Sequence, residues 1–130
     1  MIRVALVEDQ NLIRASLKQA LHDFADIVVV AEAATPERAV WLATHLVIDV
    51  MLLDIGLGGE ASGLDVARTL QGNAKCPRII AVTSYDDIVP QLRELGVVGL
   101  VPKMSEIDVL VEAIRAVAAG GEAFPVEFSR

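Results

Sequence analysis

The segment from Val47 to Leu53 limits the possible folds of this chain more than any other stretch. It is apolar except for Asp49, and it has the length of a strand. Such a run is typical of a parallel strand buried on both faces, because helices cover both sides of a parallel sheet. Asp54 comes directly after the run, and Gly56 follows closely. The segment therefore predicts a central strand that ends in a carboxylate.

Strand-length apolar runs alternate with segments of helical periodicity along the whole chain. The strands are predicted at residues 4–7, 27–30, 47–53, 78–83 and 97–101. Right-handed crossovers between parallel strands place helices on both faces of a sheet. The chain is therefore expected to form an α/β three-layer sandwich, with a five-stranded parallel sheet and about five helices.

Residue types indicate where several helices begin. Thr35 precedes Pro36, which is typical of an N-cap followed by the first helical position. A helix is also expected from Asp86 to Leu95, and it should be short or irregular because Pro90 lacks a backbone N–H. The stretch Ser105–Asp108 matches a capping box and predicts the start of the last helix.

Composition excludes several classes of protein. The 130 residues suit one domain, and the formal charge of −7 argues against direct binding to nucleic acid or to an anionic membrane. Cys76 is the only cysteine, so no internal disulfide can form and a cytoplasmic location is expected. The first residues fit neither a signal peptide nor a membrane span, because the short apolar run stops at Glu8 and Asp9.

Polar residues follow four of the five predicted strands. In chain order these residues are Glu8, Asp9, Asp54, Thr83, Ser84 and Lys103. Parallel strands end at the same edge of the sheet, and ligands of such sheets bind beyond this edge. The six side chains are therefore expected to form one site.

The chemistry of this set indicates phosphoryl transfer. Three neighbouring carboxylates repel one another unless a cation neutralises them, and Mg²⁺ prefers such oxygen ligands. Asp54 can act as the nucleophile, while Lys103 neutralises charge on the phosphoryl oxygens. Thr83 can donate a hydrogen bond to the transferred group. Gly56 can offer its backbone carbonyl to the metal because no side chain interferes.

These residues also carry a family resemblance. Glu8-Asp9 and the stretches LLDIG, VTS and VPK, in this order, resemble the receiver domain of two-component response regulators. The resemblance implies the CheY-like strand order 2-1-3-4-5 and a receiver domain at residues 1–121. Residues 122–130 would be a tail or the start of a linker. The stretch EIDVLVEAIRAVAAGGEAF looks most like receivers that precede a LuxR-type or NarL-type DNA-binding domain.

The resemblance implies a role for each residue of the set. Asp54 would accept a phosphoryl group from a histidine kinase or phosphotransfer protein, with Glu8, Asp9, Asp54 and the Gly56 carbonyl around Mg²⁺. Thr83 with the adjacent Ser84, and Lys103, would switch a surface for protein contact or homodimerisation and so regulate transcription. DNA would be bound only through an effector domain outside these residues, and any catalysis would be limited to the protein's own phosphorylation and dephosphorylation.

Three positions depart from the family pattern. Leu100 stands where receivers commonly have an aromatic switch residue, and Met104 follows Lys103 where proline is usual. Gly58 and Gly59 replace a common proline after the phosphorylation site, so a more mobile loop is expected there.

Other functions were compared with this one. A dehalogenase-type phosphatase needs a second aspartate two residues after its nucleophile, where this chain has Gly56. A flavodoxin-type protein needs a hydroxyl-rich phosphate loop after the first strand, where this chain has EDQN. The remaining alternative is a receiver-like binding module that works without phosphate, and Leu100 leaves this hypothesis open.

Overall fold

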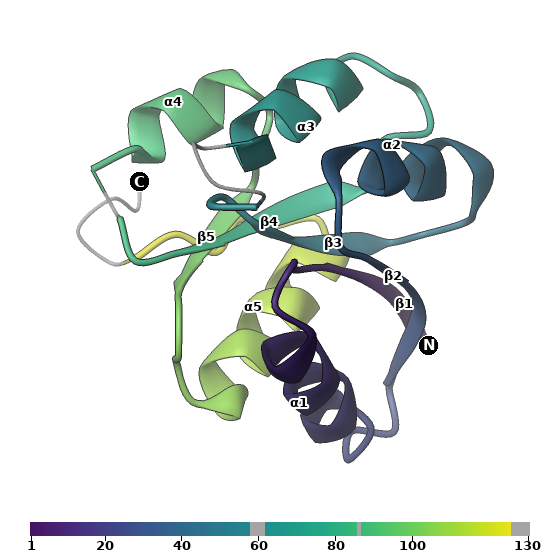
Figure 1. Cartoon of the computed structure of the whole chain (residues 1–130). Coiled ribbons are helices and arrows are strands. Elements are labelled where there is room, and N and C mark those ends of the chain that lie inside the picture. Colours follow the sequence, from purple (N-terminus) through teal and green to yellow (C-terminus); the bar gives the residue numbers. More distant parts are fainter. Residues whose placement is uncertain (58–61, 86, 126–130) are drawn as a thin grey trace.

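The computed structural model describes residues 1–57, 62–85 and 87–125. Strands and helices alternate through these residues (Figure 1). The strands are β1 (Ile2–Val7), β2 (Ile27–Ala33), β3 (Val50–Asp54), β4 (Arg78–Thr83) and β5 (Gly99–Pro102). The helices are α1 (Asn11–Leu21), α2 (Pro36–His45), α3 (Ser62–Leu70), α4 (Val89–Glu94) and α5 (Ile107–Ala118).

The strands form one parallel sheet in the order β2-β1-β3-β4-β5, as expected. Helices α1 and α5 cover one face of the sheet, and α2, α3 and α4 cover the other (Figure 1). Every residue of β3 is buried, and the strand lies between β1 and β4. The prediction of a central strand with both faces covered is therefore confirmed.

Strand boundaries differ from the prediction at several ends. β3 begins at Val50 rather than at Val47, and the residues before it make side-chain contacts: the Asp49 carboxylate accepts a hydrogen bond from the Arg3 backbone N–H. The Arg3 side chain donates to the Val47 carbonyl at 2.7 Å. β2 continues to Ala33, and β5 runs from Gly99 to Pro102, two residues later at its start than predicted.

Of the two predicted helix caps, the structure confirms one and contradicts the other. The Thr35 hydroxyl accepts a hydrogen bond from the Arg38 backbone N–H at 3.2 Å, so the predicted cap of α2 is confirmed. The predicted capping box of α5 is wrong. Ser105 donates its hydroxyl to the Pro102 carbonyl at 2.6 Å, and Glu106 takes the N-cap position without a capping hydrogen bond from its side chain.

Helix α4 is short, as the early proline predicts. It contains six residues, and Pro90 lies in its first turn. The helix ends before Gly96, whose φ of +80° closes the turn in the left-handed region that glycine favours. The predicted start at Asp86 lies outside the described residues, as do Gly58 and Gly59 of the expected mobile loop.

A charged network ties α1 to β2. Glu32 on β2 accepts hydrogen bonds from Lys18 at 2.9 Å and from Arg14 at 3.2 Å. Arg14 also donates to the backbone carbonyl of Glu8 at 2.7 Å. The network therefore fixes the chain at the point where β1 ends.

The network predicts a pH-dependent contribution to stability. Lys18 and Arg14 lower the pKa of Glu32, so its ion pairs stabilise the fold above the unfolded pKa of about 4.5 and are lost as the pH falls through the lower folded value. Glu32→Gln is expected to reduce the free energy of unfolding by about 0.5–1 kcal/mol at pH 7. Urea unfolding followed by circular dichroism should show this difference disappearing in acid. Glu112→Gln, at an exposed position in the middle of α5, is the control, and an equal loss there would contradict the assignment.

Candidate functional site

The site lies at the edge of the sheet where the parallel strands end. Glu8 follows β1, Asp54 is the last residue of β3, and Thr83 is the last residue of β4. Lys103 follows β5 directly. Glu8, Asp54 and Thr83 are the buried polar residues of the described chain, with 3–4 % of their surface exposed. The strand ends therefore bring together side chains that are far apart in the sequence.

Asp54 is held by two donors on one of its oxygens. The Lys103 ammonium lies 3.3 Å from Asp54 Oδ1. The backbone N–H of Gly56 donates to the same oxygen at 3.0 Å. Because Asp54 is only 3 % exposed, these partners replace water that the carboxylate would otherwise bind. The carboxylate is therefore held in one orientation at the end of a rigid strand.

Two further carboxylates lie beside Asp54. One oxygen from each of Glu8, Asp9 and Asp54 can be chosen so that all lie within 4.8 Å of one another. Burial, and to a lesser extent the Asp54 carboxylate, together raise the pKa of Glu8 to about 7, although the backbone N–H of Gln10 opposes the shift by donating to Glu8. The cluster thus carries negative charge that Lys103 alone does not offset.

This donor set fits a divalent metal ion such as Mg²⁺. Carboxylate oxygens are hard ligands, and Mg²⁺ usually takes one or two of them and keeps several water molecules. Glu8 is buried while Asp9 is exposed, so the cluster has one side open to solvent. Metal binding by the backbone carbonyl of Gly56 stays a prediction.

The end of β4 is joined to the end of β5. The Lys103 backbone N–H donates to the Thr83 carbonyl at 3.1 Å, and the Thr83 hydroxyl accepts from the Tyr85 backbone N–H at 3.2 Å. Ser84 lies next to Thr83 and is exposed, so its expected part in binding phosphate stays a prediction. A movement of the Thr83 backbone would therefore displace Lys103 as well.

Two contributions to the site were not predicted. Arg14 and Glu32 hold the backbone at Glu8, although the end of β2 had suggested no site. Gly63 in α3 lies against the backbone that carries Asp54: a Cβ there would be 2.5 Å from the Asp54 carbonyl oxygen. Neither contact follows from a local pattern, because each joins different elements of the fold.

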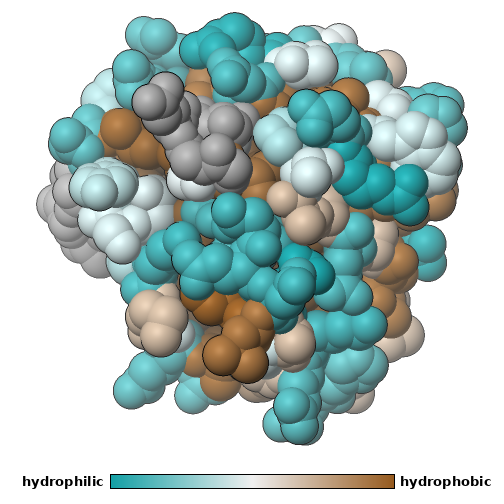
Figure 2. All heavy atoms as spheres, viewed as in Figure 1, coloured by the Kyte–Doolittle hydropathy of each residue, from teal (hydrophilic) through white to brown (hydrophobic). Residues whose placement is uncertain are grey.

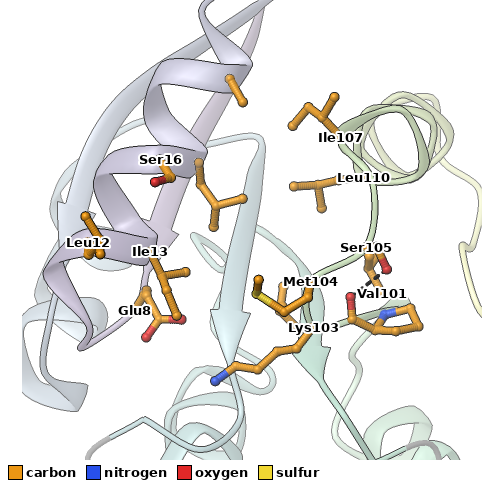
Figure 3. A pocket seen from close by; sticks show the side chains of 14 residues that line it. Glu8, Leu12, Ile13, Ser16, Val101, Lys103, Met104, Ser105, Ile107 and Leu110 are labelled. Atoms are coloured by element: carbon orange, nitrogen blue, oxygen red, sulfur yellow. Dashed lines mark hydrogen bonds between the residues drawn. The ribbon is translucent and has the colours of Figure 1, made fainter.

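An apolar pocket adjoins the site between α1 and α5. It has a volume of about 420 Å³, and Glu8 and Lys103 lie at one end of it (Figure 3). Figure 2 shows apolar surface in the region of these two helices. Leu12 and Met104, both of which line the pocket, are 81 % and 87 % exposed. Met104 has a φ of +64°, which is uncommon for a residue with a side chain.

Comparison with known proteins decides the family. Residues 4–115 match the family described as the response regulator receiver domain. The chain belongs to this family. The receiver is 39 % identical over 124 residues to the nitrate/nitrite response regulator protein NarP of Escherichia coli, covering 94 % of this chain and 57 % of NarP. It is 34 % identical over 122 residues to the transcriptional regulatory protein LiaR of Bacillus subtilis, covering 92 % and 57 %.

Solved structures give the same result for the fold of the receiver. A LuxR-family two-component response regulator from Aurantimonas sp. SI85-9A1 has a TM-score of 0.86 and 28 % identity, covering 96 % of this chain and 90 % of the other. The signal receiver domain of the response regulator NarL from Mycobacterium tuberculosis has a TM-score of 0.82 and 30 % identity, covering 92 % and 97 %. The expected resemblance to LuxR/NarL-type receivers is therefore confirmed.

The receiver spans only part of its curated relatives, about 57 % of the length of NarP and of LiaR. Within residues 1–57, 62–85 and 87–125, no helix is both long enough and apolar enough to cross a membrane.

Gly63 provides a test of how the loop backbone is positioned. In Gly63→Ala the new Cβ would meet the backbone of Asp54 and Ile55 at 2.5 and 2.6 Å, and backbone atoms cannot move aside as a flexible side chain can. The free energy of unfolding is expected to fall by about 1–3 kcal/mol in urea denaturation. Gly56→Ala is the matched control, because its Cβ would lie at an ordinary 3.7 Å from Asp54 Oδ1. Equal stability of both variants would contradict the close approach.

Glu8 provides a test of the cost of a buried charge at the site. Because its folded pKa of about 7 exceeds the unfolded value of 4.5, ionised Glu8 costs stability as the pH rises between these values. Glu8→Gln is expected to raise the free energy of unfolding on the order of 2 kcal/mol at pH 8 in a metal chelator, and to change little at pH 4. Denaturation followed by circular dichroism measures both. Glu112→Gln, exposed on α5, should show no such difference. A destabilised Glu8→Gln protein at pH 8 would refute the raised pKa of Glu8.

Proposed function

We propose that this receiver is the phosphoacceptor of a two-component system and that Asp54 carries the phosphoryl group. The proposal rests on the environment of Asp54. Its carboxylate is buried, the Lys103 ammonium lies 3.3 Å away, and the carboxylates of Glu8 and Asp9 lie close enough to share one ion with it. A structural aspartate at a strand end would need only a counter-charge. The additional carboxylates are costly for stability unless they serve a cation.

The proposed reaction is an in-line displacement at phosphorus. A carboxylate oxygen of Asp54 forms the new O–P bond while the bond between phosphorus and the donor breaks, and the donor keeps the electron pair. With a phosphohistidine donor, the broken bond is P–N and the imidazole nitrogen takes up that pair. No proton leaves Asp54, because the reacting form is the carboxylate. The proposed donor in the cell is a histidine kinase or a phosphotransfer protein.

The residues around Asp54 have separate tasks in this reaction. Glu8, Asp9, Asp54 and the Gly56 carbonyl would hold Mg²⁺, which supplies Lewis-acid neutralisation of the phosphoryl oxygens when bound. Lys103 holds the Asp54 carboxylate in place before transfer. After transfer its ammonium can pair with the oxygens of the phosphoryl group. Transfer then depends on positioning and electrostatics rather than on an acid or base.

The switch would begin at Thr83 and Ser84. A phosphoryl group on Asp54 offers new acceptor oxygens, and the Thr83 hydroxyl, which accepts from the Tyr85 N–H, still has its own hydrogen to donate to them. Lys103 is joined to Thr83 through the backbone, so both strand ends respond together. Leu100 is buried in the core and cannot act as an aromatic switch. The output would therefore come from the α4 and β5 backbone.

The wider role follows from relatives of the receiver. LiaR is a transcriptional regulatory protein and NarP a nitrate/nitrite response regulator by name. We place the receiver in the cytoplasm, in a protein that regulates transcription through a separate DNA-binding domain. Phosphorylation would change a surface used for homodimerisation or for contact with that domain.

The decisive experiment is intact-protein mass after incubation with acetyl phosphate and Mg²⁺. The wild-type receiver should gain one phosphoryl group, and Asp54→Asn or a chelator should abolish the gain. Asp49→Asn is the matched control, because Asp49 precedes β3 at its opposite end and its amide replacement can still accept from Arg3.

Two results would count against this function. A phosphoryl group on the Asp54→Asn protein would refute the assignment of the acceptor. A folded wild-type receiver that binds Mg²⁺ but gains no mass would instead support the phosphate-independent binding module.

A further inference from the structure

The last described residues of the chain return to the sheet and pair with β5. The Ala123 backbone N–H donates to the Val98 carbonyl at 2.9 Å, and the Leu100 N–H donates to the Ala123 carbonyl at 3.0 Å. Ala123 thus forms a parallel bridge opposite Gly99 at the outer edge of the sheet. The segment Glu122–Phe124 therefore occupies the edge of β5 as an added strand would.

Side chains of α4 hold the same segment. The Arg93 guanidinium donates to both carboxylate oxygens of Glu122, at 3.0 and 3.2 Å. It also lies over the Phe124 ring at 4.2 Å from the ring centre. Phe124 itself packs against the core beneath α4. One arginine thus makes an ion pair and a cation–π contact with two residues of the segment, and its side chain is only 16 % exposed.

The surface accepts only certain residues. A Cβ at Gly99 would lie 3.1 Å from the Ala123 carbonyl oxygen and 3.3 Å from the Ala123 side chain, so the two strands meet where neither carries bulk. Arg93 selects an acidic residue on one side of this point and an aromatic residue on the other. The edge of β5 with Arg93 therefore recognises an extended acidic–small–aromatic segment.

This surface is connected to the phosphorylation site through β5, which has four residues. Leu100, whose N–H binds Ala123, lies three positions before Lys103. Pro102 of the same strand pairs with Thr83. The Leu100 side chain packs in the core cluster that includes Leu92 of α4. A displacement of β5 or α4 therefore changes the distance between the β5 edge and Arg93, the two parts of the surface that hold the segment.

We propose that Glu122–Phe124 is a latch, bound in cis to the β5 edge and Arg93, and that phosphorylation of Asp54 releases it. The proposal rests on the proposed function for its trigger. The latch contacts belong to the arrangement in which Lys103 is paired with Asp54. An arrangement that draws Thr83 and Lys103 toward a phosphoryl group moves β5 relative to α4, and it separates the backbone contacts of Ala123 from the side-chain contacts of Arg93.

Linkage requires the converse effect. If phosphorylation weakens the latch, then weakening the latch must favour the phosphorylated arrangement by the same factor. A variant with a loosened latch should therefore resemble the phosphorylated protein before any phosphodonor is added.

The first measurement is amide hydrogen exchange by NMR, with and without excess acetyl phosphate and Mg²⁺, and with intact mass taken on the same sample. Exchange at the Leu100 and Ala123 amides is expected to accelerate about tenfold on phosphorylation. The Val7 amide in β1 serves as the internal reference and should not change. Unchanged protection of both latch amides in a protein shown to carry a phosphoryl group would overturn the proposal.

Variants separate the latch from its trigger. Arg93→Gln is expected to accelerate exchange at the same two amides without phosphodonor, and Phe124→Leu should act in the same direction while keeping an apolar side chain. Arg115→Gln is the matched control, since Arg115 makes a similar double contact with Asp26 and lies over Phe24. Protection that is equal in Arg93→Gln and wild type would show that Arg93 does not hold the segment, and would refute the latch.

Failure of the proposed function is distinguishable from failure of the latch. If the wild-type receiver gains no phosphoryl mass, the proposed function and the trigger both fail. Exchange in unphosphorylated Arg93→Gln still decides whether the surface binds the segment. If mass is gained but the latch stays protected, the function stands and the latch proposal falls.

Discussion

The burial of one carboxylate determines most of this structure. Asp54 ends a strand whose residues are all buried, so its charge must be met by donors from the protein. Lys103 can supply a counter-charge only because β5 ends at the same edge of the sheet as β3. Gly56 supplies a backbone N–H from the loop immediately after the strand. The site can therefore form only in a sheet whose strands are parallel and end at the same edge.

The backbone at the site is positioned by contacts from two directions. Gly63 allows α3 to approach the Asp54 carbonyl, where a side chain would not fit. On the other side, Glu32 orients Arg14, which binds the carbonyl of Glu8. Glu8 and Asp54 are therefore held close despite their repulsion. The free energy that maintains this arrangement comes from packing and hydrogen bonds outside the site.

The sequence predicted the sheet, and the meeting of polar side chains at its edge, for a physical reason. A parallel strand with both faces covered must be apolar throughout, so β3 is recognisable without knowledge of its neighbours. Because ligands of such sheets bind at the strand ends, the polar residues that follow the strands could be placed together before their contacts were known. The cap at Thr35 was also predictable, since the hydroxyl binds an amide only three residues away. These features depend on local sequence or on one general rule of topology.

Features that depend on distant partners could not be predicted. Ser105 has the residue type and spacing of a helix cap, but the nearby Pro102 carbonyl takes its hydroxyl instead. Val47 looked like a strand residue, yet its carbonyl accepts from the Arg3 side chain, and the Asp49 carboxylate accepts from the Arg3 backbone N–H. Nothing local to Ala123 indicates that it pairs with the edge of β5. The Pro102 carbonyl is a local competitor, whereas the partners of Asp49, Val47 and Ala123 come near only after the chain has folded.

The strand order also affects how the fold can be reached. Of the five strands β1 is synthesised first, but it lies inside the sheet and pairs with β2 on one side and β3 on the other. Its pairing of Val4 with Val50 closes a loop of about 46 residues, and such non-local closure slows folding. During synthesis the apolar edge of β1 therefore stays unpaired until β3 has emerged. The N-terminal third of the chain is the part of this molecule most dependent on protection from other chains while it is being made.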